Sequence, residues 1–516
     1  MAKTLDRPTS LRDDPQEIES SEEQLDGKRV PSPSMSGLYR AAWRWHFYAG
    51  LFVIPVLLVL AVTGMIYLFK PQVEPMLYRD KMRVALPAEG TRPVPYGDQV
   101  AAVEKAYPRY RVVSVQTPTY PTRSTQVNVT RKGEEGADQW TGVDKFVFVN
   151  PYTGAVLGDL NAADTFMADV RELHGNLMVG GQEGIGDWIV ELIASWGVIL
   201  VASGFYLWWR GRKPRKAQRA SGPLHGRSLT RNRHALIGAL AGGFLAFFIV
   251  SGLPWSSFWG NGIGKIATTT GTDSPELAED ATTSKPPVLN KDLAGGNNGL
   301  PWATELLEVP SSDSSGQPHH GETGAAPSDT SPASKPQAIG IDRVIAIAEA
   351  RSSPKYGVTV LMPEGETGVY TTNNTQPNNP HADHTLGIDQ YSGKVLSSVT
   401  FGDYGPLGKA ISDGIALHEG RRFGAGNLWF NFLIVAGVIF LAVTGPMMWW
   451  KRRPKGAFAP PRRSNDPKTR RRLFWVVMFP IGILFPLGGI TMLAVLALDW
   501  LVLRRIPRLA RAFGSA

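Results

Sequence analysis

The chain has 516 residues, a formal net charge of +9 and no cysteine, and 43% of its residues are hydrophobic. Without thiols it cannot hold an iron–sulfur cluster, a thiolate zinc site or a thioether-linked haem, so histidine is the strongest remaining ligand for a metal cofactor. The basic residues gather in short stretches between apolar blocks, which indicates membrane topology and makes nucleic-acid binding the weaker interpretation.

Four apolar blocks are long enough to cross a membrane, because a spanning helix needs ~20 mostly apolar residues. The first, third and fourth of them contain no charged residue. We therefore expect a membrane α-helical bundle with four main spans. The blocks are 47–69, 192–209, 235–259 and 427–450.

The two ends of the chain flank this bundle. Residues 1–36 are polar and lack the pattern of a cleavable signal peptide, so we expect a disordered cytoplasmic tail followed by an uncleaved first span at 37–69. Residues 473–503 are apolar but contain Pro480 and Pro486, and a single crossing would place the basic tail 504–516 outside, against the charge rule. We expect this C-terminal segment to be a re-entrant or hairpin pair of half-helices.

Two basic loops set the expected orientation. Residues 211–233 contain no acidic residue, and residues 451–472 contain ten Lys or Arg against Asp466 alone. The positive-inside rule makes both loops cytoplasmic. The sequence thus predicts a multi-pass membrane protein with its N-terminus in the cytoplasm.

One unit occurs twice in the chain, as an internal duplication. Each copy has a histidine that opens an apolar helix, an external segment, a second histidine in LHG or LHE, and an apolar helix that ends in two tryptophans. The order in the first copy is 37–69, 70–170 and 171–210, and in the second copy it is 234–259, 260–413 and 414–450.

Each external segment is expected to be a small α+β domain. Helical spacing at 101–107 and 342–350 is followed by alternating strands with glycine-bearing turns at 150–154 and 389–393. The second segment carries an insertion at about 268–335 that is rich in Ser, Thr, Pro and Gly, and we expect it to be disordered.

The repeated histidines sort by membrane side. His46 and His234 fall at the cytoplasmic edge, and His174 and His418 fall at the external edge. Pseudo-twofold symmetry would face each pair across the bundle, which is the arrangement that two axial imidazoles on a haem iron require. A single histidine at such a depth is more simply an interfacial residue bonded to a headgroup or a carbonyl, but four in repeat register favour ligation.

Other motifs carry weaker signals. The HxxH pair His381 and His384 lacks a carboxylate frame for a metal, and GNGIG at 260–264 is expected to be a flexible exit from the third span. The small-residue motifs VTG at 62–64, ASG at 202–204 and VTG at 443–445 permit close approach of helices. The remaining histidines are expected to be solvated: His225, His319 and His320.

The motifs WHFYAGLF, LHGNLMVGG, RHALIGAL and LHEGRRFGAG resemble those of the PepSY-associated transmembrane proteins, which include inner-membrane ferric-siderophore reductases such as ferrioxamine reductase. The resemblance covers about 43–504, without the insertion. It implies two external PepSY-like domains and two haem b groups, with His46, His174, His234 and His418 as axial ligands of the iron. It also implies reduction of a periplasmic ferric siderophore, which releases Fe(II) for iron uptake.

The expected partners follow from this resemblance. Some relatives are fused to a flavin reductase domain, whereas here the expected electron donor is a separate cytoplasmic protein or the quinone pool, beside membrane lipids. We therefore predict a haem-dependent ferric-chelate reductase. The alternative is a membrane-anchored PepSY binding or regulatory protein without redox activity, which leaves the paired histidines unexplained. A third possibility is a carrier that transports the chelate across the bilayer. The sequence lacks the intramembrane charges and the broken mid-span helices that such a carrier needs.

Overall fold

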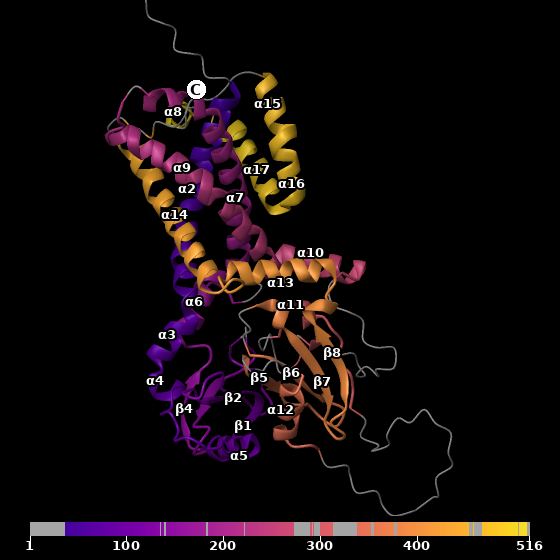
Figure 1. The fold of residues 1–516 in the computed structure, drawn as a ribbon. Helices are drawn as coiled ribbons and strands as arrows, with labels where there is room; N and C mark the ends of the chain where they lie inside the picture. Colours follow the sequence, from indigo (N-terminus) through magenta and orange to yellow (C-terminus); the bar gives the residue numbers. More distant parts are fainter. Residues whose placement is uncertain are drawn as a thin grey trace, which may run out of the picture.

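A computed structural model describes most of the chain between residues 37 and 512. It shows a long helical bundle, a β-sheet region at one end of the bundle, and helices that lie crosswise between the two (Figure 1). The described residues are 37–134, 136–138, 141–181, 184–220, 222–272, 289–290, 293, 300–312, 338–351, 356–375, 379–453, 458, 467–503 and 505–512.

Four long apolar helices form the core of the bundle, in agreement with the four predicted spans. α2 packs against α7 and α14, and α9 packs against α7 and α14. Buried alanines and glycines let these helices approach closely, since small side chains bring backbones together. The bounds are α2 (Gly37–Tyr67), α7 (Ile185–Arg210), α9 (Gly226–Gly252, continued by η2, Leu253–Trp255) and α14 (Ala425–Trp450).

The C-terminal segment doubles back at Phe485, as Figure 1 shows for the yellow helices. Pro486 starts the returning arm, and Gly489 lies so close to Gly482 that a Cβ on Gly489 would be 2.6 Å from the Gly482 Cα. The returning arm is the fifth described helix that is long and apolar enough to cross a membrane. The elements are α15 (Pro467–Leu473), η7 (Phe474–Met478), α16 (Phe479–Leu484), α17 (Pro486–Leu498), η8 (Asp499–Leu503) and α18 (Pro507–Ala512).

The external segments do not form two separate sheets, which corrects the expectation. They share one eight-stranded antiparallel sheet, in which β1 of the first copy pairs with β5 of the second and Val115 lies opposite Val360. This pairing covers a strand edge in each half. The order is β4 (Val156–Asn161), β3 (Lys145–Val149), β2 (Thr125–Arg131), β1 (Tyr110–Gln116), β5 (Val358–Leu361), β6 (Val369–Asn374), β7 (His384–Asp389) and β8 (Val395–Thr400).

Corresponding turns and helices recur in the two halves of the sheet. Gly154 and Gly393 adopt φ of 70° and 73°, and each closes its hairpin turn with a hydrogen bond from its own N–H to the residue four positions earlier. α5 (Tyr96–Ala106) and α12 (Ile341–Glu349) cover the sheet face that is turned away from the bundle (Figure 1). Asp342 of α12 accepts hydrogen bonds from the backbone of Tyr96 and Gly97, so one half caps the helix of the other.

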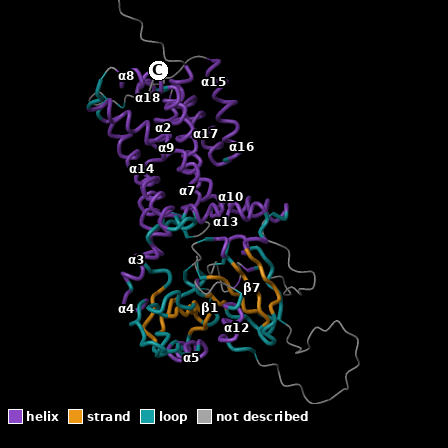
Figure 2. Tube along the Cα trace, in the orientation of Figure 1, coloured by secondary structure: helices purple, strands orange, loops and turns teal. Residues whose placement is uncertain are grey.

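Three helices occupy the junction between bundle and sheet, and Figure 2 shows two of them lying across the bundle axis. They are α6 (Phe166–Gly175), α10 (Ser257–Thr270) and α13 (Pro406–His418). GNGIG therefore lies within a helix rather than a flexible exit. The Phe258 N–H at the start of α10 donates to a Glu191 oxygen at 2.9 Å, which satisfies one of the otherwise unpaired first-turn donors.

Part of the expected disordered insertion is ordered. Residues 268–272 finish α10, and the apolar run around Leu300 packs α11 (Trp302–Glu305) beside the sheet, with Ala303 and Leu307 buried against Tyr404. His319 and His320 lie outside the described residues. The remaining short helices are α3 (Lys70–Leu77), α4 (Arg79–Met82), α8 (Arg212–Ala220), η5 (Pro380–Ala382) and η6 (Phe401–Asp403).

Candidate functional site

The four predicted histidines lie at two levels of the bundle. His46 and His234 belong to α2 and α9, near the ends that adjoin the basic loops. His174 and His418 end α6 and α13, at the junction with the sheet. Each level therefore contains one histidine from either copy.

At the sheet-side level the two rings meet. The centroids of His174 and His418 are 6.5 Å apart and the ring planes form an angle of 88°. A metal–imidazole bond is ~2 Å long and the ring centre lies ~1.2 Å behind the bonding nitrogen, so two rings on one metal ion have centres roughly 6.4 Å apart. The observed separation fits two axial imidazoles on a single iron.

At the basic-side level His46 of α2 and His234 of α9 each face a glycine of a neighbouring helix, Gly204 and Gly445. A Cβ on Gly445 would lie 3.7 Å from His234 Cε1 and 3.9 Å from Ile54 of α2, the helix that carries His46. The helix of His46 and the ring of His234 thus adjoin the same glycine.

A hydroxyl on a neighbouring helix contacts Nδ1 of every one of these histidines. In all four cases the hydroxyl belongs to a Ser or Thr that directly precedes a glycine. The contacts are His46 with Ser203 (3.2 Å), His174 with Thr63 (3.0 Å), His234 with Thr444 (2.8 Å) and His418 with Ser251 (2.8 Å). We call these four Ser/Thr-Gly pairs the histidine seats.

The seats determine which ring nitrogen carries the proton. A hydroxyl has one hydrogen, and each seat hydroxyl donates it to the carbonyl four residues earlier, at 2.8 Å for Thr63, 2.7 Å for Ser203, 2.8 Å for Ser251 and 2.7 Å for Thr444. The hydroxyl must therefore accept from Nδ1–H of the histidine. The lone pair is then left on Nε2, the nitrogen free to bind a metal.

The seat glycines make room for the rings. A Cβ on Gly64 would lie 2.9 Å from His174 Cε1, and a Cβ on Gly204 would lie 2.9 Å from His46 Cε1. The second copy is less tight, at 3.8 Å for Gly252 with His418 and 3.7 Å for Gly445 with His234. Three of the predicted small-residue motifs thus approach histidine rings.

The fourth seat, Ser251–Gly252, was missed by the sequence analysis. A signal was present, because Ser251 follows His234 by 17 residues and Thr63 follows His46 by 17 residues. The first span of each copy therefore carries a histidine for one level and a seat for the other.

The comparisons with known proteins agree with this architecture. The family model for the PepSY-associated TM region matches residues 43–452. The chain belongs to this family. No curated protein matches the chain.

All four histidines and all four seats lie inside the matched family region. With the five apolar helices, the family shows a multi-pass membrane protein that carries an additional antiparallel sheet. The C-terminal hairpin, from Pro467 onward, lies beyond the PepSY-associated match and packs on α7, where the Trp196 indole N–H donates to Thr491 at 3.0 Å.

Side chains around His418 hold the C-terminal end of α13. Asn431 donates to the carbonyls of Leu417 and His418 at 2.7 and 3.0 Å, and Asn427 donates to Leu417 at 3.2 Å. Carbonyls of a last helical turn lack partners within the helix. These two amides of α14 therefore fix the end of α13 from which the His418 ring projects.

The HxxH histidines are engaged separately. His381 stacks on Phe401 with centroids 3.9 Å apart, and its Nε2 lies 2.9 Å from Arg422 Nη2. His384 contacts the Arg351 carbonyl at 3.2 Å and the Ser398 hydroxyl at 3.0 Å. The two rings do not converge on one point. His225 directly precedes α9 in the basic loop.

Proposed function

We propose that this PepSY-associated protein is a di-haem b oxidoreductase that passes electrons through the bacterial inner membrane to a ferric siderophore. The observation that carries the proposal is the pairing of His174 with His418, at a separation that suits two ligands of one iron. His46 and His234 would hold the second haem. Each haem would supply an iron centre that gains and loses one electron.

The four seats support this role. By accepting from Nδ1–H they leave Nε2 unprotonated and hold the ring plane, which is how hydrogen-bond partners orient metal-bound histidine in proteins. A solvated or structural histidine has no need for a glycine such as Gly64 or Gly204, where a Cβ would lie 2.9 Å from the ring carbon Cε1. Four such seats in repeat register therefore favour ligation over isolated interfacial histidines.

The bundle between the two levels is apolar. Ala61, Ala241, Ile434 and Val438 form a buried cluster there, with Phe248 in contact with His418 at a centroid distance of 5.1 Å. Thr63 lies 17 residues beyond His46 on α2, so the levels are separated by ~25 Å of helix. These side chains exclude water from the path and hold the two levels in fixed relation.

The direction of transfer follows from charge and chemistry. The loops at 211–233 and 451–472 are strongly basic, which supports an orientation with the His46 and His234 level on the cytoplasmic side and the sheet in the periplasm. Ferric iron binds hard oxygen chelators much more tightly than ferrous iron, so one-electron reduction outside releases Fe(II) for uptake. A role as a PepSY binding anchor would use the sheet but leave the seats without a purpose.

The test is the colour and redox chemistry of the full-length protein. Protein purified from haem-replete cells should contain two b-type haems per chain, give a reduced-minus-oxidised spectrum with dithionite, and lose its reduced bands when a ferric siderophore is added. Protein with His384→Ala should behave identically, because that ring lies apart from the pairs. A colourless preparation would refute haem binding, and stable reduced bands in the presence of ferric chelates would refute the reductase.

A further inference from the structure

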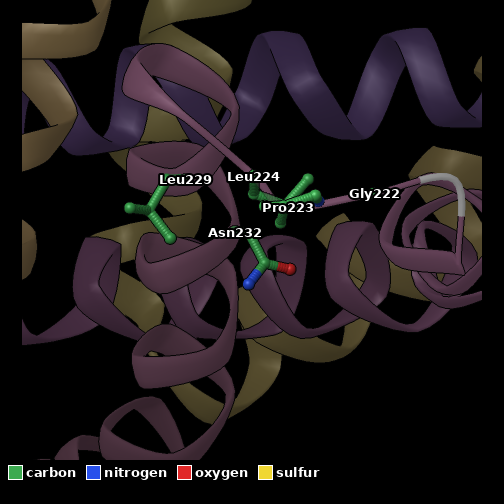
Figure 3. Close-up of a pocket in the computed structure, with 5 residues that line it drawn as sticks. All are labelled: Gly222, Pro223, Leu224, Leu229 and Asn232. Atoms are coloured by element: carbon green, nitrogen blue, oxygen red, sulfur yellow. The ribbon is translucent and has the colours of Figure 1, made fainter.

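A hollow of about 540 Å³ opens beside the basic-side level of the bundle, where the loop before α9 folds against that helix (Figure 3). Its volume falls in the range of small-molecule sites, ~300–1,000 Å³. The lining is mostly apolar. It consists of Gly222, Pro223, Leu224, Leu229 and Asn232.

The Asn232 carboxamide is the one strongly polar side chain in this lining. Asn232 is only 8% exposed, and it is one of the residues that line the hollow. A ligand that fills the hollow displaces water from this amide, and it must offer hydrogen bonds in return or the displacement costs free energy. A ligand for this hollow should therefore combine an apolar body with a group that exchanges hydrogen bonds with a carboxamide.

The hollow lies at nearly the same depth in the membrane as His234, on a different face of α9, since residues two positions apart on a helix do not face the same way. Asn232 precedes His234 by two residues on α9, which is ~3 Å along the helix axis. Arg231 and Arg233 on either side of Asn232 are exposed, as expected at the level of lipid headgroups. A molecule that resides in the bilayer can reach this position without leaving the membrane.

We propose that this hollow binds the head of an isoprenoid quinol, which serves as the electron donor. The inference rests on the proposed function. The Asn232 amide exchanges hydrogen bonds with a quinol oxygen, Pro223, Leu224 and Leu229 contact the ring, and the isoprenoid tail extends into lipid. The quinol loses two electrons and two protons to become a quinone. Its two electrons would reduce two ferric chelates, with the haems that His46, His234, His174 and His418 would hold as one-electron carriers, and its two protons would go to the cytoplasmic solvent.

The first test is binding without turnover. A photoreactive azido analogue of ubiquinone should label the peptide that spans residues 222–232 in the full-length protein. Asn232→Leu keeps the side-chain size and should lower labelling at least 10-fold. The matched control is Asn261→Leu, an exposed amide of α10 at the opposite end of the bundle, which should label as the natural chain does. Equal labelling of the two variants would overturn the quinol site, and so would displacement of the probe by phospholipid alone, which would assign the hollow to an acyl chain.

The second test separates the donor from the haem sites. In stopped-flow experiments decylubiquinol should reduce the haem of Asn232→Leu at least 10-fold more slowly than that of the natural chain, while dithionite reduces both completely. If both proteins bind haem and decylubiquinol reduces them equally fast, the quinol site is refuted and the reductase proposal stands. If neither protein binds haem, the reductase proposal fails, and the quinol-donor proposal that rests on it fails too.

Discussion

The His174 and His418 rings stand nearly perpendicular with centroids 6.5 Å apart, although they come from opposite copies of the duplication. The two rings are not brought together by contact between the helices that carry them. α6 packs on α2 and α13 packs on α9, and the hydroxyls of Thr63 and Ser251 contact Nδ1 of His174 and His418. The spans α2 and α9 thus determine how the two rings lie, and the junction helices α6 and α13 carry the rings.

Single histidine substitutions should remove the haems one at a time. His174→Ala should abolish the outer haem and His46→Ala the inner haem, so each variant keeps about half of the haem, because each iron loses one of its two axial ligands. A pyridine haemochrome assay against protein concentration measures this ratio. If either variant retained both haems, the assignment of ligands by membrane side would be wrong.

The seat glycines should differ between the two copies. In Gly64→Ala the new methyl would lie 2.9 Å from His174 Cε1, so the ring must shift and the outer haem should bind at least 10-fold more weakly. Gly252→Ala is the matched control at the same level, because its methyl would lie 3.8 Å from His418 in ordinary contact. Haem titration of the apoproteins compares them. Equal haem affinities of the two variants would contradict the prediction, because the His174 ring would then tolerate the added methyl group.

The seat hydroxyls should influence haem affinity without contacting the haem. Thr63→Val keeps the shape of the side chain but removes the acceptor for the His174 Nδ1–H, and loss of such a partner costs ~10–100-fold in metal affinity. Thr63→Ser restores the hydroxyl and should restore affinity. The reduction potential of the outer haem should move in Thr63→Val and return in Thr63→Ser; identical potentials in all three proteins would exclude a positioning role.

The shared sheet can be tested by a cross-link, because the chain has no cysteine of its own. Gln116 of β1 lies opposite Thr359 of β5, and the Cα atoms of directly opposed antiparallel residues are ~4.5–5.5 Å apart, within disulfide reach. The double variant Gln116→Cys with Thr359→Cys should form an internal disulfide. Its electrophoretic migration should therefore change on reduction. Gln116→Cys with Thr385→Cys of β7 should not.

Burial of Asp383 should make the external region less stable as pH rises. Burial raises the pKa of its carboxyl to about 7, with Glu419 adding to the effect and Arg421 opposing it. Because the folded protein holds this proton more tightly than the unfolded chain, stability is greatest at low pH and falls as pH rises toward 7. Between pH 5 and pH 8 the loss should be at most roughly 3 kcal/mol. Asp383→Asn should remove this dependence in denaturation curves, and parallel curves for the two proteins would contradict it.

Much of the bundle could be predicted from the sequence, because long apolar runs and the repeated order of histidine, external segment and double tryptophan are local signals. The hairpin at Phe485 was predictable from Pro486 and the adjacent glycines. The pairing of β1 with β5 was not, since strand partners that are far apart in sequence leave no local pattern. The strand β6 was hidden by its polar composition, Thr371–Asn374.

The candidate site divides in the same way. Repeat register identified all four histidines, whereas the hydroxyl contacts were not predicted, because Ser-Gly and Thr-Gly pairs are common wherever membrane helices pack closely. Only the fold reveals that the hydrogen of each hydroxyl is already used by its own helix. The ordered structure of residues 300–312 was not predicted, because polar residues surround this stretch in the sequence.

Of the outermost strands of the sheet, β4 is followed by α6, and β8 is followed by η6 and then α13. The two outer strands of the sheet thus connect to the helices that carry the two sheet-side imidazoles, and the pairing of β1 with β5 joins the two halves at the centre. If the chain were divided between the two copies, neither half would keep a complete histidine pair. On the proposed function each haem iron would lose one of its two histidine ligands, so neither copy alone would form a complete haem site.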